Sequence, residues 1–197
     1  MGKRAFIIGL TGAMGMGKSE TARLFAAEGI PVFDADAAVH DLYAEPGALA
    51  GEIEKLFAGA VTPAGIDRAA LSAQMTPQKL QKLEALVHPA VAAARSRFLE
   101  ENAHSAMVLL DIPLLLETGV AVDAVVVASA PAHVQKARVL GRPGMTDEKF
   151  AALAARQLSD AEKRQQAHYV VMTDQGLDQA REQVKMILAD LRKKISA

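Results

Sequence analysis

One segment constrains the fold of this 197-residue chain more than any other. Residues 12–19 read Gly-Ala-Met-Gly-Met-Gly-Lys-Ser and match the pattern G-x-x-x-x-G-K-S without a gap. The apolar run 5–10 comes directly before it, and a helical pattern of apolar residues follows from Lys18 to Glu28. A strand, a glycine-rich turn and a helix in this order are typical of a loop that binds phosphate groups.

The residue types of this loop suit phosphate chemistry. Glycines let the backbone wrap closely around phosphate oxygens with its N–H groups pointing inward. The N-terminus of the following helix adds positive potential. We expect Lys18 to contact the β- and γ-phosphates of ATP, and the Ser19 hydroxyl to bind Mg²⁺. The predicted nucleotide-binding residues of the loop are Gly12, Gly15, Met16, Gly17, Lys18, Ser19 and Glu20.

Two other interpretations of the loop are weaker. An accidental glycine-rich turn would not explain the strand before it and the helix after it. A dinucleotide-binding turn would need a glycine at position 20, where this chain has Glu20. Both alternatives are therefore disfavoured.

Short apolar runs alternate with helical patterns along most of the chain. The expected strands are 5–10, 30–33, 106–111, 123–128 and 169–172, and the later helices are 131–141, 147–166 and 176–195. This alternation predicts an α/β protein with a P-loop NTPase fold, in which helices cover both faces of a five-stranded parallel sheet. We expect a single domain over residues 1–197, with a helical acceptor-binding insertion at about 37–101 and a small lid at about 138–160.

Composition excludes several classes of protein. The chain has no cysteine, so thiolate metal sites and cysteine nucleophiles are ruled out, and an intracellular protein is favoured. Its net charge of −1 argues against a dedicated nucleic-acid binder. The run 5–10 is too short for a signal peptide, and no later stretch is long and apolar enough to span a bilayer. We expect a cytoplasmic protein with no membrane, nucleic-acid or obligate protein partner.

Three carboxylates follow predicted strands, at the sheet edge where open α/β folds bind ligands. Asp34 and Asp36 come after the strand 30–33, and in an extended segment they would point the same way. Either is a candidate base for an acceptor hydroxyl, and either is equally suited to cap the next helix. Asp111 ends another strand and is expected to bind Mg²⁺ with Ser19, unless it is only a strand-end cap or a turn residue.

The remaining candidates are contacts to the γ-phosphate and to the acceptor. Arg138 and Arg142 are four residues apart on a predicted helix face, where they would clamp the γ-phosphate or form a solvated basic face. His88 is expected either to touch the acceptor or to be a packed structural residue. Leu115 and Glu117 belong to an expected acceptor-facing loop, although the leucines there also suit the core.

A kinase with a small acceptor fits these features best. The chain lacks the Asn-Lys-x-Asp signature of guanine-binding proteins and is short for a motor or a transporter ATPase. A nucleoside monophosphate kinase and a kinase for another small alcohol are rivals of the same class. A nucleotide-gated binding module without catalysis is a rival of another class, disfavoured by a carboxylate as well placed as Asp36.

Nearly the whole chain resembles the dephospho-CoA kinase family. The residues that carry the likeness are the loop 12–19, Val32-Phe33-Asp34-Ala35-Asp36, Gly65-Ile66-Asp67-Arg68, His88-Pro89-x-Val91, Asp111-x-Pro113-Leu114-Leu115-Leu116-Glu117, Arg138-x-x-x-Arg142, Gln157, Glu162-Lys163 and Tyr169-Val170-Val171. The resemblance implies transfer of the ATP γ-phosphate to the ribose 3′-hydroxyl of dephospho-CoA, giving CoA and ADP in the last step of CoA biosynthesis, with Mg²⁺.

The resemblance also implies roles for single residues. Asp36 would be the base at the 3′-hydroxyl, with Asp34 helping to order the site, and Lys18 and Arg142 would complete the catalytic set. The chain departs from the family's usual residues at Glu20, Ala92, Ala152, His168 and Thr173. These departures concern acceptor contacts and base recognition, and they leave the reaction class unchanged.

Overall fold

The computed structural model describes residues 4–44, 47 and 49–196. It divides this part of the chain into two compact units. One unit contains residues 4–33 and 102–196, and the other contains residues 34–101. The second unit includes the segment 37–101 that we expected as a helical insertion.

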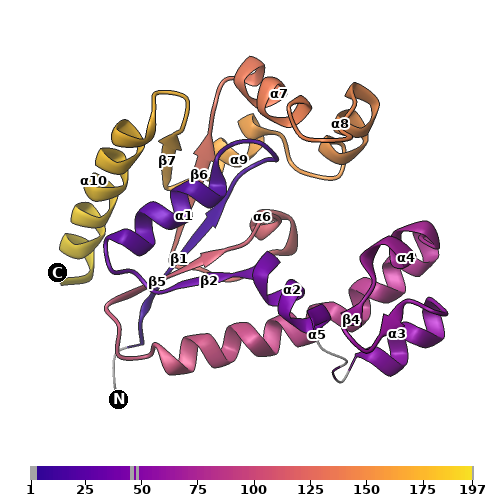
Figure 1. The fold of residues 1–197 in the computed structure, drawn as a ribbon. Helices are drawn as coiled ribbons and strands as arrows, with labels where there is room; N and C mark the ends of the chain where they lie inside the picture. Colours follow the sequence, from indigo (N-terminus) through magenta and orange to yellow (C-terminus); the bar gives the residue numbers. More distant parts are fainter. Residues whose placement is uncertain (1–3, 45–46, 48, 197) are drawn as a thin grey trace. The chain divides into compact units, whose positions relative to one another are not determined.

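A five-stranded sheet lies at the centre of the first unit (Figure 1). Its strands, in spatial order, are β2 (Val32–Asp34), β5 (Met107–Asp111), β1 (Phe6–Thr11), β6 (Ala124–Ser129) and β7 (Tyr169–Met172). β1 pairs in parallel with β5 and β6, and β6 pairs in parallel with β7. The predicted parallel α/β fold is confirmed, and each predicted strand is found within two residues of its expected bounds.

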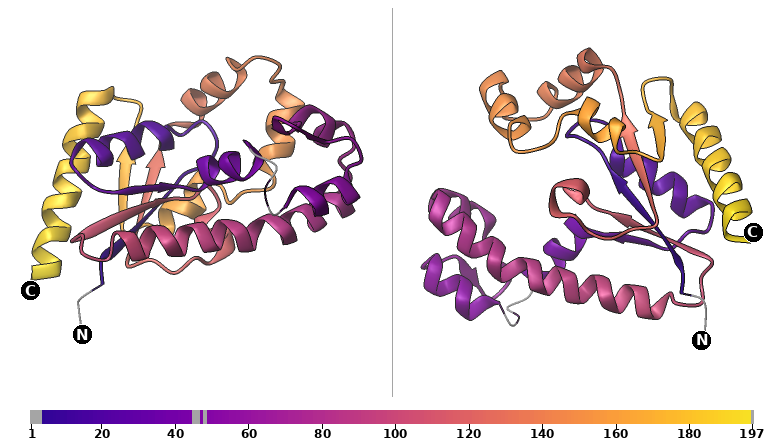
Figure 2. Two further views of the ribbon diagram at one scale, coloured as in Figure 1. Left: turned by 60° about the horizontal axis from the view of Figure 1, so that its bottom comes forward. Right: turned by 180° about the vertical axis from the view of Figure 1, so that it is seen from behind.

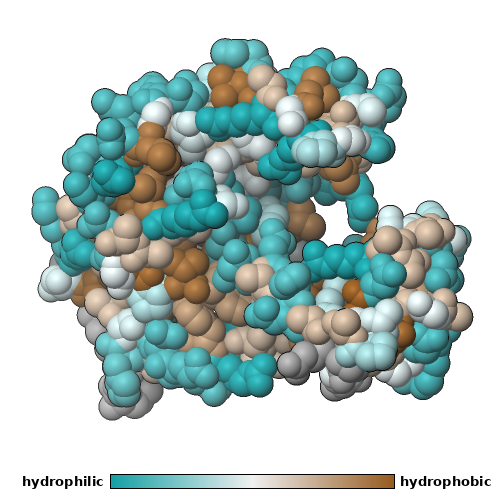
Figure 3. Space-filling view, in the orientation of Figure 1, coloured by the Kyte–Doolittle hydropathy of each residue, from teal (hydrophilic) through white to brown (hydrophobic). Residues whose placement is uncertain are grey.

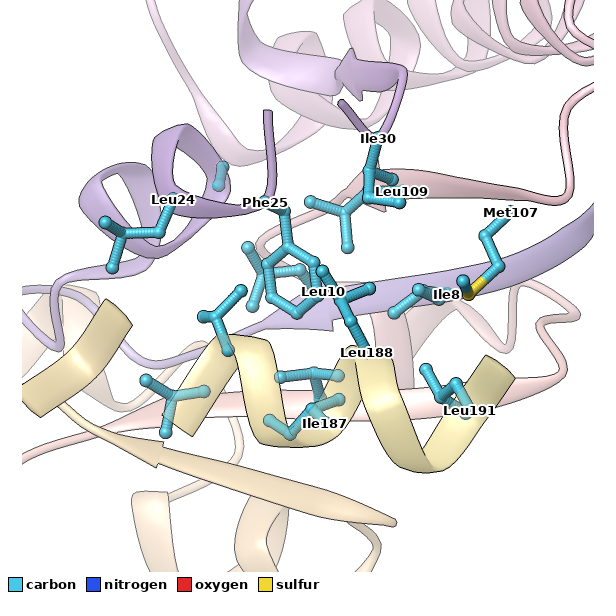
Figure 4. Close-up of a cluster of buried hydrophobic side chains, with 14 of the residues drawn as sticks. Ile8, Leu10, Leu24, Phe25, Ile30, Met107, Leu109, Ile187, Leu188 and Leu191 are labelled. Carbon is cyan, nitrogen blue, oxygen red and sulfur yellow. The ribbon is translucent and has the colours of Figure 1, made fainter. Parts of the chain in front are cut away.

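Two helices bury one face of the sheet. Helix α1 (Lys18–Ala27) and helix α10 (Leu177–Ser196) pack against each other and against the strands. Figure 4 shows Phe25 of α1 and Leu188 of α10 meeting the sheet residue Leu10, and all three side chains are fully buried. Burying one such side chain stabilises the fold by about 1.5–3 kcal/mol. This core holds α1 against the strand that precedes the glycine-rich loop.

Shorter helices cover the other face, as the fold class predicts. Helix α6 (Leu115–Thr118) contacts β1, and helix α9 (Asp160–Gln165) contacts β6 (Figure 2). Helices α7 (Ala132–Leu140) and α8 (Asp147–Ala154) contact each other.

The helical stretch predicted at about 147–166 consists of two helices, because α8 ends at Ala154 and α9 starts at Asp160. The reason is local. Ser159 and Glu162 form a capping box, in which each side chain bonds the backbone N–H of the other residue, and this pair starts a new helix.

The second unit has its own small core. Its elements are α2 (Ala35–Ala44), α3 (Ala50–Leu56), β3 (Val61–Thr62), β4 (Gly65–Ile66), α4 (Arg68–Ala73) and α5 (Pro77–Glu101). Ile53, Phe57 and Ala60 are fully buried at its centre. The antiparallel pair of β3 and β4 was not predicted, because two-residue strands are too short to show an alternating pattern.

The surface seen in Figure 3 is mostly hydrophilic, with scattered apolar side chains. In the described part of the chain, the large hydrophobic side chains that are exposed are Leu114, Leu153, Leu177 and Met186. Across the same residues, no helix combines the length and the apolar character needed to cross a bilayer.

Candidate active site

The glycine-rich loop between β1 and α1 depends on two backbone conformations. Gly15 and Gly17 have φ values of 80° and 84°, in the left-handed region that glycine adopts without a steric cost. A Cβ atom on Gly17 would lie 2.9 Å from Oγ1 of Thr173, and one on Gly15 would lie 2.6 Å from Cγ2 of Val139. The two glycines therefore let the loop approach α7 and the end of β7 closely.

Backbone amides of this loop are available for an anion. Within residues 4–44, 47 and 49–196, the N–H groups of Gly15, Gly17, Lys18 and Ser19 have no hydrogen-bond acceptor. The first N–H groups of a helix lack intrahelical partners, and the helix dipole favours negative charge there. Together these amides form the type of nest that binds phosphate oxygens.

Met16 fixes the loop through its side chain rather than offering it to a ligand. Its side chain is buried and packs against Ala13 and Ala130, and its sulfur accepts a hydrogen bond from the Ala130 N–H at 3.2 Å. Its own N–H donates to the Ala13 carbonyl at 3.1 Å. Both polar contacts lie within the protein, so Met16 serves as an anchor of the loop in this conformation.

The register of the sheet brings Lys18 and Asp111 together. Leu10 of β1 is paired with Asp111 of β5, so both strands end at the same level of the sheet. Nζ of Lys18 lies 2.6 Å from Oδ1 of Asp111, and the two side chains are 13% and 2% exposed. The predicted phosphate cation and the predicted metal carboxylate therefore neutralise each other in this structure.

The oxygen donors at this point suit Mg²⁺. Ser19 presents an exposed hydroxyl at the start of α1, and Asp111 supplies a carboxylate. Mg²⁺ is usually held by one or two protein oxygens, with water and phosphate oxygens completing its shell. In the described residues no group of three or more His, Cys, Asp or Glu side chains could hold a metal ion.

Glu20 and the two predicted arginines differ in how they are held. Glu20 forms an ion pair with Arg23 on the exposed side of α1. Arg138 donates from Nη1 to Thr173 Oγ1 at 2.9 Å and from Nη2 to the Thr173 carbonyl at 2.7 Å, which places it against the loop. Arg142 lies beyond the end of α7 and is exposed, and its side chain has no bonded partner in the described residues.

Leu115 and Glu117 are engaged inside the first unit. Leu115 is 1% exposed, and its Cδ2 fills the space where a Cβ on Gly9 would lie, only 2.5 Å away. The alternative that this leucine belongs to the core is therefore correct, and an acceptor contact by its side chain is excluded in this conformation. The Glu117 carboxylate accepts hydrogen bonds from Lys163 Nζ at 2.7 Å and from the Leu158 N–H at 2.9 Å.

The charge of Glu117 is stabilised by these partners. Burial by itself would raise the pKa of the Glu117 carboxyl, but the hydrogen bonds from Lys163 and the Leu158 amide outweigh it and hold the pKa below its ordinary value. Lys163 is fully buried and also donates to the Pro113 carbonyl at 3.2 Å. Sequence reasoning assigned no role to Lys163. Its only signal there was its place in the family-like Glu162-Lys163 pair.

The second unit carries the other predicted acceptor residues. The expectation that residues 34–36 are extended is wrong, because α2 begins at Ala35 and Asp36 lies in its first turn, exposed. Asp34 Oδ1 accepts a hydrogen bond from the Ala37 N–H at 3.0 Å, so the capping alternative holds for Asp34. His88 is exposed on α5, which argues against its alternative as a packed residue.

Two departures from the family's usual residues have structural roles. His168 Nδ1 accepts a hydrogen bond from the Val125 N–H at 3.0 Å, while the His168 N–H donates to the Val125 carbonyl at 2.9 Å. The histidine thus extends the pairing of β6 with β7. Oγ1 of Thr173 donates to the Met16 carbonyl at 2.9 Å, so the threonine ties the end of β7 to the loop.

The family model and the curated relatives point to the same family. A family model described as dephospho-CoA kinase matches residues 6–179. A dephospho-CoA kinase of Rhodopseudomonas palustris is 51% identical over 93% of this chain and 94% of its own length, and one of Cereibacter sphaeroides is 50% identical over 98% and 100%. A crystal structure of TT1252 from Thermus thermophilus superposes with a TM-score of 0.81 at 33% identity, covering 96% of this chain and 99% of that one.

Proposed function

This chain belongs to the dephospho-CoA kinase family and is a kinase, and we propose that it transfers the γ-phosphate of ATP to the ribose 3′-hydroxyl of dephospho-CoA. The products would be CoA and ADP. The observation that supports the phosphate-donor half most directly is the loop 12–19, whose four acceptor-free amides lie beside the ion pair of Lys18 and Asp111. The acceptor half rests on the family.

The loop would hold the donor. The N–H groups of Gly15, Gly17, Lys18 and Ser19 bind phosphate oxygens, and Gly12 allows the turn out of β1. Lys18 exchanges the Asp111 carboxylate for oxygens of the β- and γ-phosphates. Because the ammonium is already at the end of the sheet, this exchange needs a movement of the Lys18 side chain.

Mg²⁺ would be held by Ser19 and by Asp111 once Lys18 has turned to the phosphates. The bound ion supplies positive charge that offsets the negative charge on the phosphate oxygens during transfer. Glu20 follows Ser19 but is paired with Arg23, so part of its negative charge is already compensated near the phosphates.

The unit of residues 34–101 would bind dephospho-CoA. Asp36 lies in the first turn of α2, exposed, and it accepts the proton of the 3′-hydroxyl as the oxygen attacks phosphorus. Asp34 holds that turn by capping it, which keeps the position of Asp36 constant. His88 is proposed to contact the acceptor from α5.

Residues 138–160 would act as a lid. Arg142 is exposed and free to bind the γ-phosphate, where a guanidinium stabilises the charge that develops in transfer. Arg138 stays against Thr173 and the loop and supports the nucleotide from that side. Closure excludes water, which would otherwise take the phosphoryl group in place of the acceptor. We propose that the enzyme works in the cytoplasm without a stable protein partner.

Labelled ATP with mass detection of the product tests this function. The purified chain is incubated with ATP, Mg²⁺ and dephospho-CoA, with AMP as the rival acceptor and CoA as a control acceptor whose 3′-position is already phosphorylated. We expect a product that is heavier than dephospho-CoA by one phosphoryl group. We expect no phosphorylated product from AMP or from CoA. Phosphorylation of AMP alone would favour the nucleotide-kinase rival, and ATP binding without any product would favour the non-catalytic module.

A further inference from the structure

Gln157 touches the phosphate loop from outside it. This residue lies between α8 and α9, and its Oε1 accepts a hydrogen bond from the Met14 N–H at 3.2 Å. In the described part of the chain, no other side chain accepts a hydrogen bond from an amide of residues 12–19. This contact has no part in the proposed transfer step.

The contact fixes which way the carboxamide of Gln157 points. The Met14 N–H is a donor only, so the atom that faces it must be the oxygen of the carboxamide. The Nε2 group then points away from Met14. Among the described residues, Nε2 of Gln157 has no hydrogen-bond partner. The buried side-chain polar atom that lacks a partner there is Oδ1 of Asp160, so Nε2 is not fully buried and is open to solvent. It offers two N–H donors beside the amide nest.

Both sides of the contact are anchored. On the loop side, Gln135 of α7 donates from Nε2 to the Met14 carbonyl at 2.8 Å. Met14 is therefore held at both its N–H and its carbonyl. On the other side, the N–H of Leu158, the next residue after Gln157, donates to Glu117 at 2.9 Å. Glu117 is in turn held by the buried Lys163.

These anchors place Gln157 on the side of the loop that faces the end of β5. Lys163 donates to the carbonyl of Pro113, which follows Asp111 and Ile112 directly. Asp111 is the carboxylate proposed to hold Mg²⁺, which would offset negative charge on the phosphate oxygens. Met14 precedes the free amides at the start of α1, which would take the β-phosphate. A donor at Met14, on the side of these amides that lies toward the end of β5, would then be nearer the last phosphate than the first two.

We propose that Gln157 donates a hydrogen bond from Nε2 to the γ-phosphate of ATP and thereby helps the protein to distinguish ATP from ADP. This inference rests on the proposed use of ATP as the phosphate donor. Glu117 and Lys163 act as positioning residues, because they hold the backbone next to Gln157.

Equilibrium binding of ATP and of ADP, measured by calorimetry with Mg²⁺, tests the proposal in two variants. Gln157→Ala removes both functions of the carboxamide. Gln157→Glu keeps an acceptor for the Met14 N–H but replaces the donor by a negative charge. A hydrogen bond to a charged group is lost in each, so we expect ATP affinity to fall about tenfold in Gln157→Ala and further in Gln157→Glu. ADP affinity should stay within about twofold of the unmodified chain, because ADP has no γ-phosphate.

Gln135→Ala is the matched control, because it releases the same loop residue at its carbonyl and leaves Gln157 in place. It should change ATP and ADP affinity by the same factor. An equal loss of ATP and ADP affinity in Gln157→Ala, or no loss at all, would overturn the proposal. Since these measurements use no acceptor, a chain that binds ATP but does not phosphorylate dephospho-CoA would contradict the proposed function and leave this inference standing.

Discussion

Nζ of Lys163 lies 2.7 Å from Oε1 and 3.0 Å from Oε2 of Glu117, and the lysine side chain has no exposed surface. The pair joins α9 to α6 across residues that are far apart in the sequence. The same ammonium also reaches the Pro113 carbonyl, just beyond the carboxylate of Asp111. One buried ion pair therefore fixes the position of the segment that carries Gln157 relative to the end of β5.

Replacing Lys163 by Met should destabilise the protein. Methionine has an unbranched side chain of similar length to that of lysine. It carries no charge, so the partly buried carboxylate of Glu117 loses its cation. Removing one partner of a buried pair costs about 3 kcal/mol or more, and we expect a loss of this size in the free energy of unfolding measured with urea. The control is Lys185→Met, whose exposed pair with Glu182 should contribute no measurable stability. Equal effects in the two variants would contradict this interpretation.

The pair should also make the stability of the protein depend on pH in the acid range. The pKa of Glu117 is held below its ordinary value of 4.5, so at falling pH the unfolded chain takes up this proton before the folded chain does. The stabilisation is complete above the ordinary value and is lost as the pH falls through the pKa of the folded state. We therefore expect the difference in free energy of unfolding between the unmodified chain and Glu117→Gln to narrow between about pH 6 and about pH 3. A difference that is constant over this range would argue against the assigned role of the carboxylate.

Lys18→Met should reduce the rate of phosphoryl transfer by about 10²-fold or more, because one preorganised cation is lost at the phosphates. The variant also removes the ammonium that neutralises Asp111. A circular dichroism melt must therefore accompany the kinetics to show that the chain is folded. Lys55→Met, which changes an exposed lysine paired with Glu52, serves as the control for removing a positive charge. Near-normal kcat in folded Lys18→Met would refute the assignment of the phosphate loop.

Asp36→Asn should depress kcat by about 10²- to 10⁴-fold while ATP binding stays nearly intact, because a base acts on the transfer step. Asp34→Asn is the matched control in the same turn. Asparagine also caps helices well, so this variant should keep the turn of α2 and most of the activity. The measurements are kcat with dephospho-CoA and the affinity for ATP. Unchanged turnover in Asp36→Asn would remove Asp36 from the catalytic set.

The parallel sheet and the phosphate loop were predictable because their signals are local. A buried parallel strand is a short apolar run, and five such runs were recognisable in the sequence. The loop requires glycines at fixed spacing, and Gly15 and Gly17 do adopt the conformations that only glycine takes easily. The predictions that differ from the structure concern residues where a helix begins. The capping box at Ser159 divides the expected helical stretch into two helices, and the capping of α2 by Asp34 places Asp36 in a helix.

The contacts of four residues could not be predicted from the sequence, namely those of Leu115, Glu117, Lys163 and Gln157. Leu115 was one of three consecutive leucines, and only its contact above Gly9 identifies it as a core residue. Glu117 was expected at the acceptor, but the fold supplies it with a buried ammonium. Gln157 had no assigned role, because nothing in the sequence places it against Met14.

The sequence by itself determined the class of chemistry, because phosphate binding depends on a contiguous run of eight residues whose glycines, lysine and serine act through neighbouring backbone. Only the tertiary structure decided which side chains meet around that loop. The register of β1 with β5 brings Lys18 to Asp111, and the packing of α6 and α9 brings Glu117 to Lys163 and Gln157 to the loop. Such pairs join residues more than forty positions apart, and their partners are chosen by burial and sheet register rather than by any local pattern.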